Sequence, residues 1–108
     1  MKGLIIVDVQ SDFLPGGAFA VPRGNQIIPV INELLQLSFD VIIATKDWHP
    51  KKHCSFASTH GKSVGERVNI EGIEQILWPD HCVQNTPGSS LSKQINSDKI
   101  DEFIYKGT

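Results

Sequence analysis

The sequence predicts an α/β fold in which a parallel sheet is flanked by helices. Two continuous runs of aliphatic and β-branched residues, 4–7 and 41–45, lack the alternation of a half-exposed strand. A sheet covered by helices on both faces selects such runs. Apolar residues recur at helical spacing between them. The order strand, helix, strand predicts one right-handed βαβ unit over residues 4–45.

The helix between these strands is expected to begin at Asn25, whose side chain can cap it, and to end near Ser38. Pro29 is tolerated only in the first turn, because proline lacks the amide hydrogen that later positions donate. One face of the helix carries the apolar residues that would pack on the sheet: Ile27, Ile28, Ile31, Leu34 and Leu35.

The rest of the chain is less regular. Residues 50–88 are polar and rich in Gly, Ser and Pro, with at most a short helical turn at 70–77. A connection of this length inside a compact domain is usually functional. We expect a second short crossover helix at 89–96 and a third strand at 102–105. Residues 1–108 are therefore interpreted as one small domain.

Charge and composition argue against several classes of function. The net charge is -2 and the ten Lys and Arg residues are scattered, so no basic stripe is present to neutralise nucleic-acid phosphates. No apolar segment is long enough for a signal peptide or a membrane span. We expect a cytoplasmic protein with neither nucleic-acid nor membrane partners, in which Cys54 and Cys82 are free thiols.

Polar residues follow the ends of the three predicted strands. Asp8 follows the first, Asp47 and His49 follow the second, and Lys106 follows the third. Because the carboxyl ends of parallel strands meet at one edge of a sheet, where ligands bind, these groups are expected to lie together. Taken singly, Asp8 could also cap a turn and Lys106 could be a solvated lysine.

The chain also contains the residue types of a divalent-metal site. In residues 45–50, Thr-Lys-Asp-Trp-His-Pro, a carboxylate and an imidazole lie two positions apart, and His53 and His81 follow. Nitrogen and oxygen ligands with open positions for water or substrate are typical of a catalytic metal. The alternative is a turn that carries surface histidines.

Four motifs, in order along the whole chain, resemble those of bacterial nicotinamidases (pyrazinamidases), which are isochorismatase-like cysteine hydrolases. Two segments, Asp-Trp-His-Pro and Trp-Pro-Asp-His-Cys-Val, are specific to the nicotinamidase branch. The resemblance implies a Rossmann-like, isochorismatase-type parallel sheet, present here as its N-terminal half. The motifs are Asp-Val-Gln-Ser-Asp-Phe at 8–13 with Gly16 and Gly17, Thr-Lys-Asp-Trp-His-Pro at 45–50 with His53 and Ser-Phe-Ala at 55–57, Trp-Pro-Asp-His-Cys-Val-Gln at 78–84, and Tyr-Lys-Gly at 105–107.

The resemblance implies hydrolysis of nicotinamide, and of pyrazinamide, to the acid and ammonia, a step of NAD salvage. Asp8 corresponds to the general base, and Lys106 to the cation that stabilises the thiolate and the reacting carbonyl. Asp47, His49 and His81 correspond to the ligands of one divalent metal ion. Zinc is the expected ion, with iron or manganese as alternatives.

Other positions take less direct roles from the resemblance. Phe13 and Trp78 fall where the family places aromatic walls around the substrate ring, although both could be ordinary core aromatics. His53 corresponds either to an extra ligand or to a residue that supports the ligands from outside. His60 matches no position that needs a histidine.

The nucleophilic cysteine of the family has no counterpart in these residues. In the family it lies well beyond the Tyr-Lys-Gly motif, in a second half. Cys54 lies where relatives carry small residues, and Cys82 is expected to be a packed thiol. We therefore expect a domain that is incomplete at its C-terminus and that self-associates or binds a complementary C-terminal half, because its sheet would keep an unpaired edge and partly uncovered apolar faces.

Three functions remain open from the sequence. The first is an amidase to which this chain contributes the base, the lysine and the metal site. The second is an inactive, truncated module that binds a metal or a nicotinamide-like ring. The third is a related hydrolase acting on another small amide or on isochorismate. The metal-ligand motifs argue against the third, because the branches without metal do not need those ligands.

Overall fold

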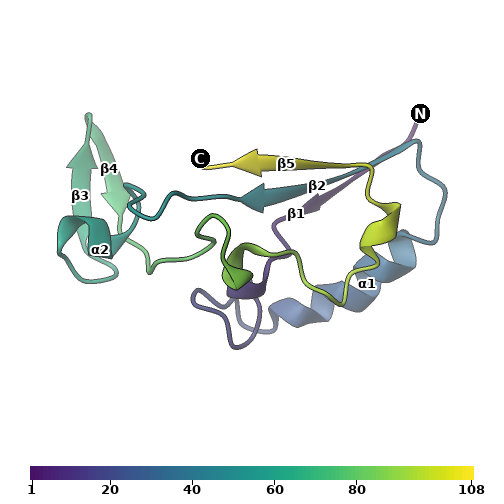
Figure 1. Cartoon of the computed structure of the whole chain (residues 1–108), viewed down its shortest axis with the longest axis horizontal. Helices are drawn as coiled ribbons and strands as arrows, with labels where there is room; N and C mark the ends of the chain where they lie inside the picture. The colour runs from purple at the N-terminus through teal and green to yellow at the C-terminus, as the bar shows by residue number, and fades with distance from the viewer.

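The computed structural model describes residues 1–108, and its centre is a parallel sheet with strand order β1-β2-β5 (Figure 1). β1 spans Gly3–Val7, β2 spans Val41–Asp47 and β5 spans Glu102–Lys106. Both pairings are parallel, so the three carboxyl ends lie at one edge. The predicted parallel α/β sheet is confirmed.

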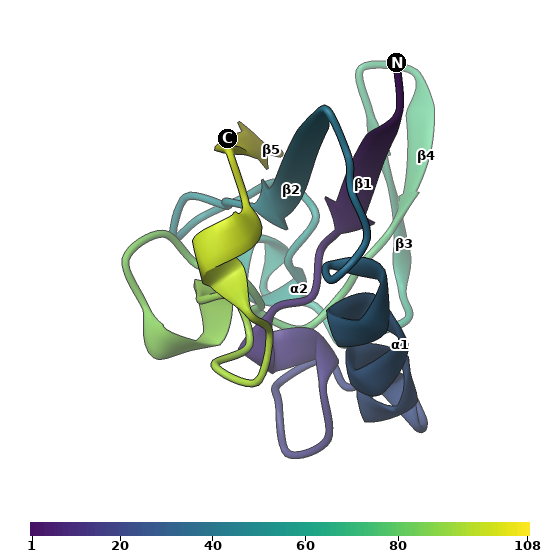
Figure 2. The ribbon, with the colours of Figure 1, turned by 90° about the vertical axis from the view of Figure 1, so that its right-hand side faces the viewer.

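One helix packs on this sheet. α1, Ile27–Leu34, connects β1 to β2 and lies against one face (Figure 2). It begins two residues later than the predicted Asn25, because a 3-10 turn, Gly24–Gln26, precedes it, and it ends at Leu34 and not near Ser38. Pro29 lies in its first turn, where no amide hydrogen is required. The core between helix and sheet consists of Ile6, Val9, Ile28, Leu35, Ile42, Ala44 and Ile95.

The opposite face of the sheet is open. Ile5 and Val7 of β1 are 64% and 60% exposed, whereas Ile6 between them is buried. Ile104 of β5, which shares a row with Val7 through β2, is 46% exposed. The partly uncovered strand faces agree with the expectation from the sequence, and the covering on both faces that the apolar run at 4–7 favours is not present, because the core forms on the α1 side alone.

The long stretch after β2 contains a hairpin that the sequence did not predict. β3, Arg67–Ile70, and β4, Ile73–Ile76, pair antiparallel where a helical turn at 70–77 was expected. Glu71 and Gly72, with φ of 49° and 86°, form the left-handed turn that a tight hairpin needs. Glutamate is uncommon at such a position, so the hairpin signal in the sequence was weak.

The predicted crossover helix at 89–96 is also absent. This connection contains two 3-10 turns instead, Pro87–Ser89 and Ser97–Lys99. Its central part forms backbone hydrogen bonds with the segment that follows β1, including an antiparallel bridge between Leu91 and Gln10. Backbone groups that pair with another segment are not available for a helical ladder.

A one-turn helix, α2, Ala57–His60, lies close to the hairpin. Both lie beyond the carboxyl ends of the sheet strands, at the end of the molecule opposite the N-terminus (Figure 1). None of the helices is long and apolar enough to cross a membrane.

Candidate metal centre and active site

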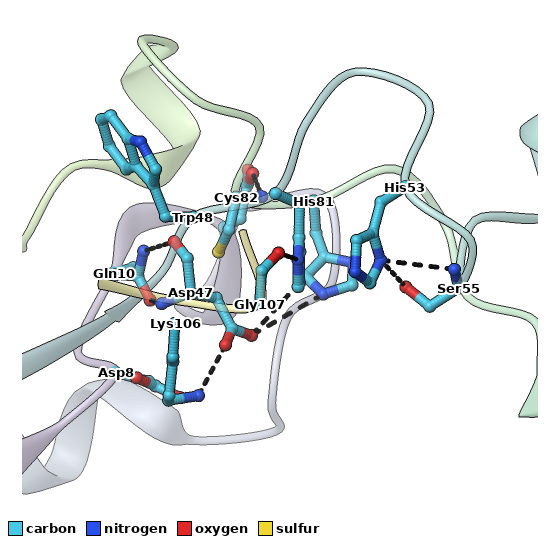
Figure 3. Close-up of polar contacts among 12 residues, drawn as sticks. Asp8, Gln10, Asp47, Trp48, His53, Ser55, His81, Cys82, Lys106 and Gly107 are labelled. Atoms are coloured by element: carbon cyan, nitrogen blue, oxygen red, sulfur yellow. Dashed lines mark hydrogen bonds and ion pairs between the residues drawn. The ribbon is translucent and has the colours of Figure 1, made fainter. Parts of the chain in front are cut away.

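The predicted polar residues meet at the carboxyl edge of the sheet (Figure 3). The parallel register places Asp47 opposite Lys106, and Asp8 follows β1 directly. Lys106 Nζ lies 2.7 Å from Asp8 Oδ2 and 2.6 Å from Asp47 Oδ1. Three strands therefore contribute to one cluster of charges, as the positions of these residues in the sequence predicted.

Two carboxylates hold Lys106 in its charged form. Desolvation alone would lower the pKa of its ammonium group, but hydrogen bonds from this group to Asp47 and Asp8 and their negative charges outweigh that effect and raise the pKa. Thr45 Oγ1 donates a 2.7 Å hydrogen bond to the other oxygen of Asp8. The backbone of Asp8 is left-handed, with φ of 54°, which turns the chain out of the strand.

Asp47, His49 and His81 converge beside this cluster, with one donor atom from each within 4.8 Å of the others. Asp47 Oδ2 lies 3.6 Å from His49 Nε2 and 3.9 Å from His81 Nε2, separations that are too long for hydrogen bonds. Backbone pairing brings the two histidines together: His49 N–H donates to the Cys82 carbonyl, and Gln84 N–H donates to the His49 carbonyl.

Both imidazoles turn Nε2 towards the carboxylate of Asp47. His49 Nδ1 lies 2.8 Å from the Gly107 carbonyl oxygen, and His81 Nδ1 lies 2.8 Å from the Pro79 carbonyl oxygen. A carbonyl can only accept, so Nδ1 is the protonated nitrogen of the neutral ring, and Nε2 then has a free lone pair. Two nitrogen lone pairs and a carboxylate oxygen thus face one another, an arrangement that a divalent cation would satisfy.

A buried aromatic ring supports the imidazoles. Phe56 is fully buried and contacts His49, His53 and His81 edge to face, with centroid distances of 5.5, 5.6 and 5.4 Å. His53 stacks on His49 at 4.1 Å and its Nδ1 lies 2.7 Å from Ser55 Oγ. Burial, followed by the neighbouring imidazoles, lowers the pKa of His53. His53 therefore lies beside the three-residue group and outside it.

Of the predicted aromatic walls, Phe13 contacts the group of Asp47, His49 and His81 directly, and Trp78 is connected to it through Phe19. Phe13 packs on His81 with a centroid distance of 5.5 Å. Phe19 lies between Phe13 and Trp78, with ring centroids 6.2 and 5.2 Å from theirs, and its centroid is 4.9 Å from that of His81. The sequence prediction missed Phe19, because it lies in a loop without periodicity whose path depends on a backbone bond from Phe19 N–H to the Asp12 carbonyl.

The two cysteines differ in their surroundings. Both are free, as expected. Cys82 is fully buried, and burial, together with nearby carboxylates, raises the pKa of its thiol to about 12. Cys54 is exposed and directly follows His53 in the turn after β2. Its carbonyl oxygen accepts a hydrogen bond from His60 Nε2.

We expect iodoacetamide at pH 8 to modify Cys54 in the folded chain and to leave Cys82 unmodified. With a thiol pKa of about 12, the thiolate fraction of Cys82 at this pH is on the order of 10⁻⁴. Intact mass and peptide mapping should show one adduct, on Cys54, and two adducts after unfolding in urea. Equal modification of both thiols under native conditions would show that this account of Cys82 is wrong.

The curated proteins that the chain resembles are nicotinamidases. No family model matches the chain. It is 46% identical over 105 residues to the nicotinamidase of Acinetobacter baylyi, covering 96% of this chain and 49% of the relative. It is 41% identical over 109 residues to the nicotinamidase of Escherichia coli, covering 98% and 51%. The chain spans about half the length of the curated relatives it matches.

Solved structures of such proteins share the fold. An Acinetobacter baumanii nicotinamidase/pyrazinamidase matches with a TM-score of 0.91 at 40% identity, over 97% of this chain and 51% of that one. The yeast nicotinamidase bound to the inhibitor nicotinaldehyde matches with 0.87 at 38%, over 99% and 57%. The pyrazinamidase of Pyrococcus horikoshii in complex with zinc matches with 0.71 at 41%, over 98% and 51%. The predicted isochorismatase-type α/β fold is confirmed.

Proposed function

We propose that this chain, which is homologous to the N-terminal portion of nicotinamidases and pyrazinamidases, supplies the base, the lysine and the metal ligands of an amidase. The reaction is hydrolysis of nicotinamide, or pyrazinamide, to the acid and ammonia. One observation carries this proposal: Asp47 directs one carboxylate oxygen to Lys106 and the other to His49 and His81. Groups suited to proton transfer and to metal binding therefore lie side by side.

The proposed metal is one divalent ion held by Asp47 Oδ2, His49 Nε2 and His81 Nε2. Zinc is the preferred ion, because two imidazoles and a carboxylate form a common zinc ligand set and a related pyrazinamidase has been solved with zinc. The same ligands also suit iron and manganese. When bound, the ion would act as a Lewis acid and would hold the ring nitrogen of the substrate.

Asp8 is the proposed general base. It takes the proton of a cysteine thiol, the thiolate attacks the carboxamide carbon, and the acid form of Asp8 returns the proton to the departing ammonia. The thioester that remains reacts with water, from which Asp8 again removes a proton. That step releases the carboxylic acid and restores the thiol. Lys106, held cationic by Asp8 and Asp47, stabilises the thiolate and the negative charge on the reacting carbonyl.

The thiol is proposed to come from polypeptide other than these 108 residues, because Cys82 is buried with a pKa of about 12 and Cys54 lies in an exposed turn. The open face of the sheet is where that polypeptide would pack. Ile5 and Val7 expose apolar surface there, and β1 has a strand neighbour on one side only. Asp47 and Lys106 lie on the same face, so a covering segment would reach them.

Co-expression with the C-terminal half of a homologous nicotinamidase tests this function. We expect the chain alone to release no ammonia from nicotinamide, and a stable complex of the two halves to release it. A C-terminal half whose nucleophilic cysteine is replaced by alanine is the control. A stable, metal-loaded complex without turnover would contradict the amidase and favour a module that only binds metal. A monomeric chain with no affinity for the half would contradict the proposed partner.

Gly107 provides a separate test of the metal site. It has a φ of 67°, and a Cβ atom at this position would lie 2.5 Å from His49 Cε1. Gly107→Ala should displace the His49 ring and weaken zinc binding by about ten- to hundredfold, as loss of a ligand's support typically does. Competition with a chromophoric chelator measures this change.

Gly61→Ala is the matched control for this substitution. Gly61 has a similar φ of 62°, but no atom lies within 4 Å of its Cβ position. Both substitutions carry the backbone cost of alanine in a left-handed conformation, about 1 kcal/mol. Only Gly107→Ala should change the zinc affinity, and equal affinities in the two variants would contradict the assignment of His49.

A further inference from the structure

Gln10 is a buried polar residue that none of the proposed roles uses. Its side chain is inaccessible to solvent and lies where the chain has just left β1. Nε2 donates to the Asp47 carbonyl at 2.8 Å and to the Ser89 carbonyl at 2.9 Å. Oε1 accepts from the Asp47 N–H at 2.9 Å. Figure 3 shows the Gln10 amide against the main chain at Asp47.

The Gln10 amide replaces the backbone hydrogen bonds that β1 would make to Asp47 if it continued beside β2. β1 pairs with β2 as far as Val7 opposite Thr45, and the last backbone bond runs from Asp8 N–H to the Thr45 carbonyl at 3.1 Å. The left-handed Asp8 then turns the main chain away. Asp47 lies two residues after Thr45, so its N–H and carbonyl point to the same side. The Gln10 side chain offers them one acceptor and one donor, as a paired strand would.

Gln10 is itself held firmly. On one side of it, Ser11 N–H donates to the Ser90 carbonyl at 2.9 Å; on the other, Ser92 N–H donates to the Val9 carbonyl at 2.8 Å. The backbone on both sides of Gln10 is hydrogen-bonded, and both hydrogens of its side-chain amide are donated. Such a buried amide can hold the end of a strand in one position.

We propose that Gln10 is a positioning residue of the metal centre, which acts by holding the backbone of Asp47. Its effect is to fix the direction in which this carboxylate faces Lys106 with one oxygen and the imidazoles of His49 and His81 with the other. The inference rests on the metal site proposed above. Each imidazole has its own carbonyl partner. Asp47 Oδ2 has no hydrogen-bond donor, so its place depends on Lys106 and on the backbone that Gln10 holds.

Gln10→Met tests this role, because it removes the three hydrogen bonds, nearly preserves the side-chain length and adds no charge. Asn32→Leu is the matched control: Asn32 of α1 holds backbone in the same two-ended way, with Nδ2 donating to the Gln94 carbonyl at 2.8 Å and Oδ1 accepting from Asn96 N–H at 2.9 Å. We expect Gln10→Met to weaken zinc binding by about ten- to hundredfold. Asn32→Leu should leave the zinc affinity unchanged. Chelator competition on the whole chain measures both.

Amide hydrogen exchange in the metal-free chain gives a second measurement. The Asp47 N–H should exchange faster in Gln10→Met, because it has lost its acceptor, and at the wild-type rate in Asn32→Leu. If Gln10→Met does not fold, Gln10→Asn keeps an amide that is too short to reach and should show the same two effects.

The outcomes separate the two proposals. If the wild-type chain binds zinc and the Gln10 variants keep both its affinity and its exchange rate at Asp47, the positioning role is wrong and the metal site stands. If Asn32→Leu lowers the zinc affinity as much as Gln10→Met, the effect is one of general stability and the role is again wrong. If the wild-type chain does not bind zinc, the metal site and the inference both fail.

Discussion

His49→Ala is expected to abolish retention of the divalent ion. The substitution removes one of three protein donors, and a site left with one imidazole and one carboxylate cannot enclose the ion. It also removes the ring that stacks on His53 and meets the edge of Phe56, and it leaves the Gly107 carbonyl without its partner. The loss of affinity should exceed the roughly hundredfold that removal of a supporting residue causes.

Dialysis against metal-free buffer, followed by elemental analysis, measures this effect. We expect one ion per wild-type chain and none in His49→Ala. His60→Ala is the matched control, because His60 is partly exposed, its side chain bonds to the Cys54 carbonyl and it lies outside the proposed ligand group. Equal metal content in the wild type and His49→Ala would refute the proposed centre. If His60→Ala also loses the ion, the loss in His49→Ala would be explained by unfolding and not by removal of a ligand.

Asp8→Asn is expected to lower the turnover of the complex between this chain and a C-terminal half by about 10²- to 10⁴-fold, the usual contribution of a general base. The amide is nearly the same size as the carboxylate and its oxygen can still accept the hydrogen bond from Thr45. It cannot take a proton from a thiol or from water. Because Asp8 is not among the metal ligands, the metal content of the complex should stay the same.

Asp101→Asn is the control for this experiment. Asp101 precedes β5 and accepts a 2.8 Å hydrogen bond from Ile42 N–H at the opposite end of the sheet from the site. Its substitution should affect stability and leave kcat unchanged. A steady-state ammonia assay on both complexes distinguishes the two positions. Turnover by Asp8→Asn at the wild-type rate would mean that another group is the base.

The parts of this protein that could be predicted from the sequence are those set by short-range rules. The uninterrupted apolar runs at 4–7 and 41–45 predicted strands, and both strands are present. The carboxyl ends of parallel strands share an edge, so the positions of Asp8 and Lys106 just after or at strand ends were sufficient to place them together.

Other features depend on contacts between distant segments. The hairpin of β3 and β4 has a weak local signal, and the 89–96 segment forms no helix because its backbone bonds with the segment after β1. Phe19 reaches His81 through a loop whose path no periodicity encodes. The sequence predicted that apolar strand faces would stay partly uncovered, but it did not predict which face, because an apolar run does not say which element will cover each face.

The sequence by itself determined the chemical groups of this protein: a carboxylate and a lysine at strand ends, and a carboxylate with two imidazoles suited to a divalent ion. Only the tertiary structure decided their geometry. Backbone pairing of His49 with residues 82–84 brings the imidazoles together, carbonyl oxygens select their protonated nitrogens, and the Gln10 amide holds the main chain at Asp47. The physical reason is that residue type is local, whereas the direction of a lone pair depends on partners that lie far away along the chain.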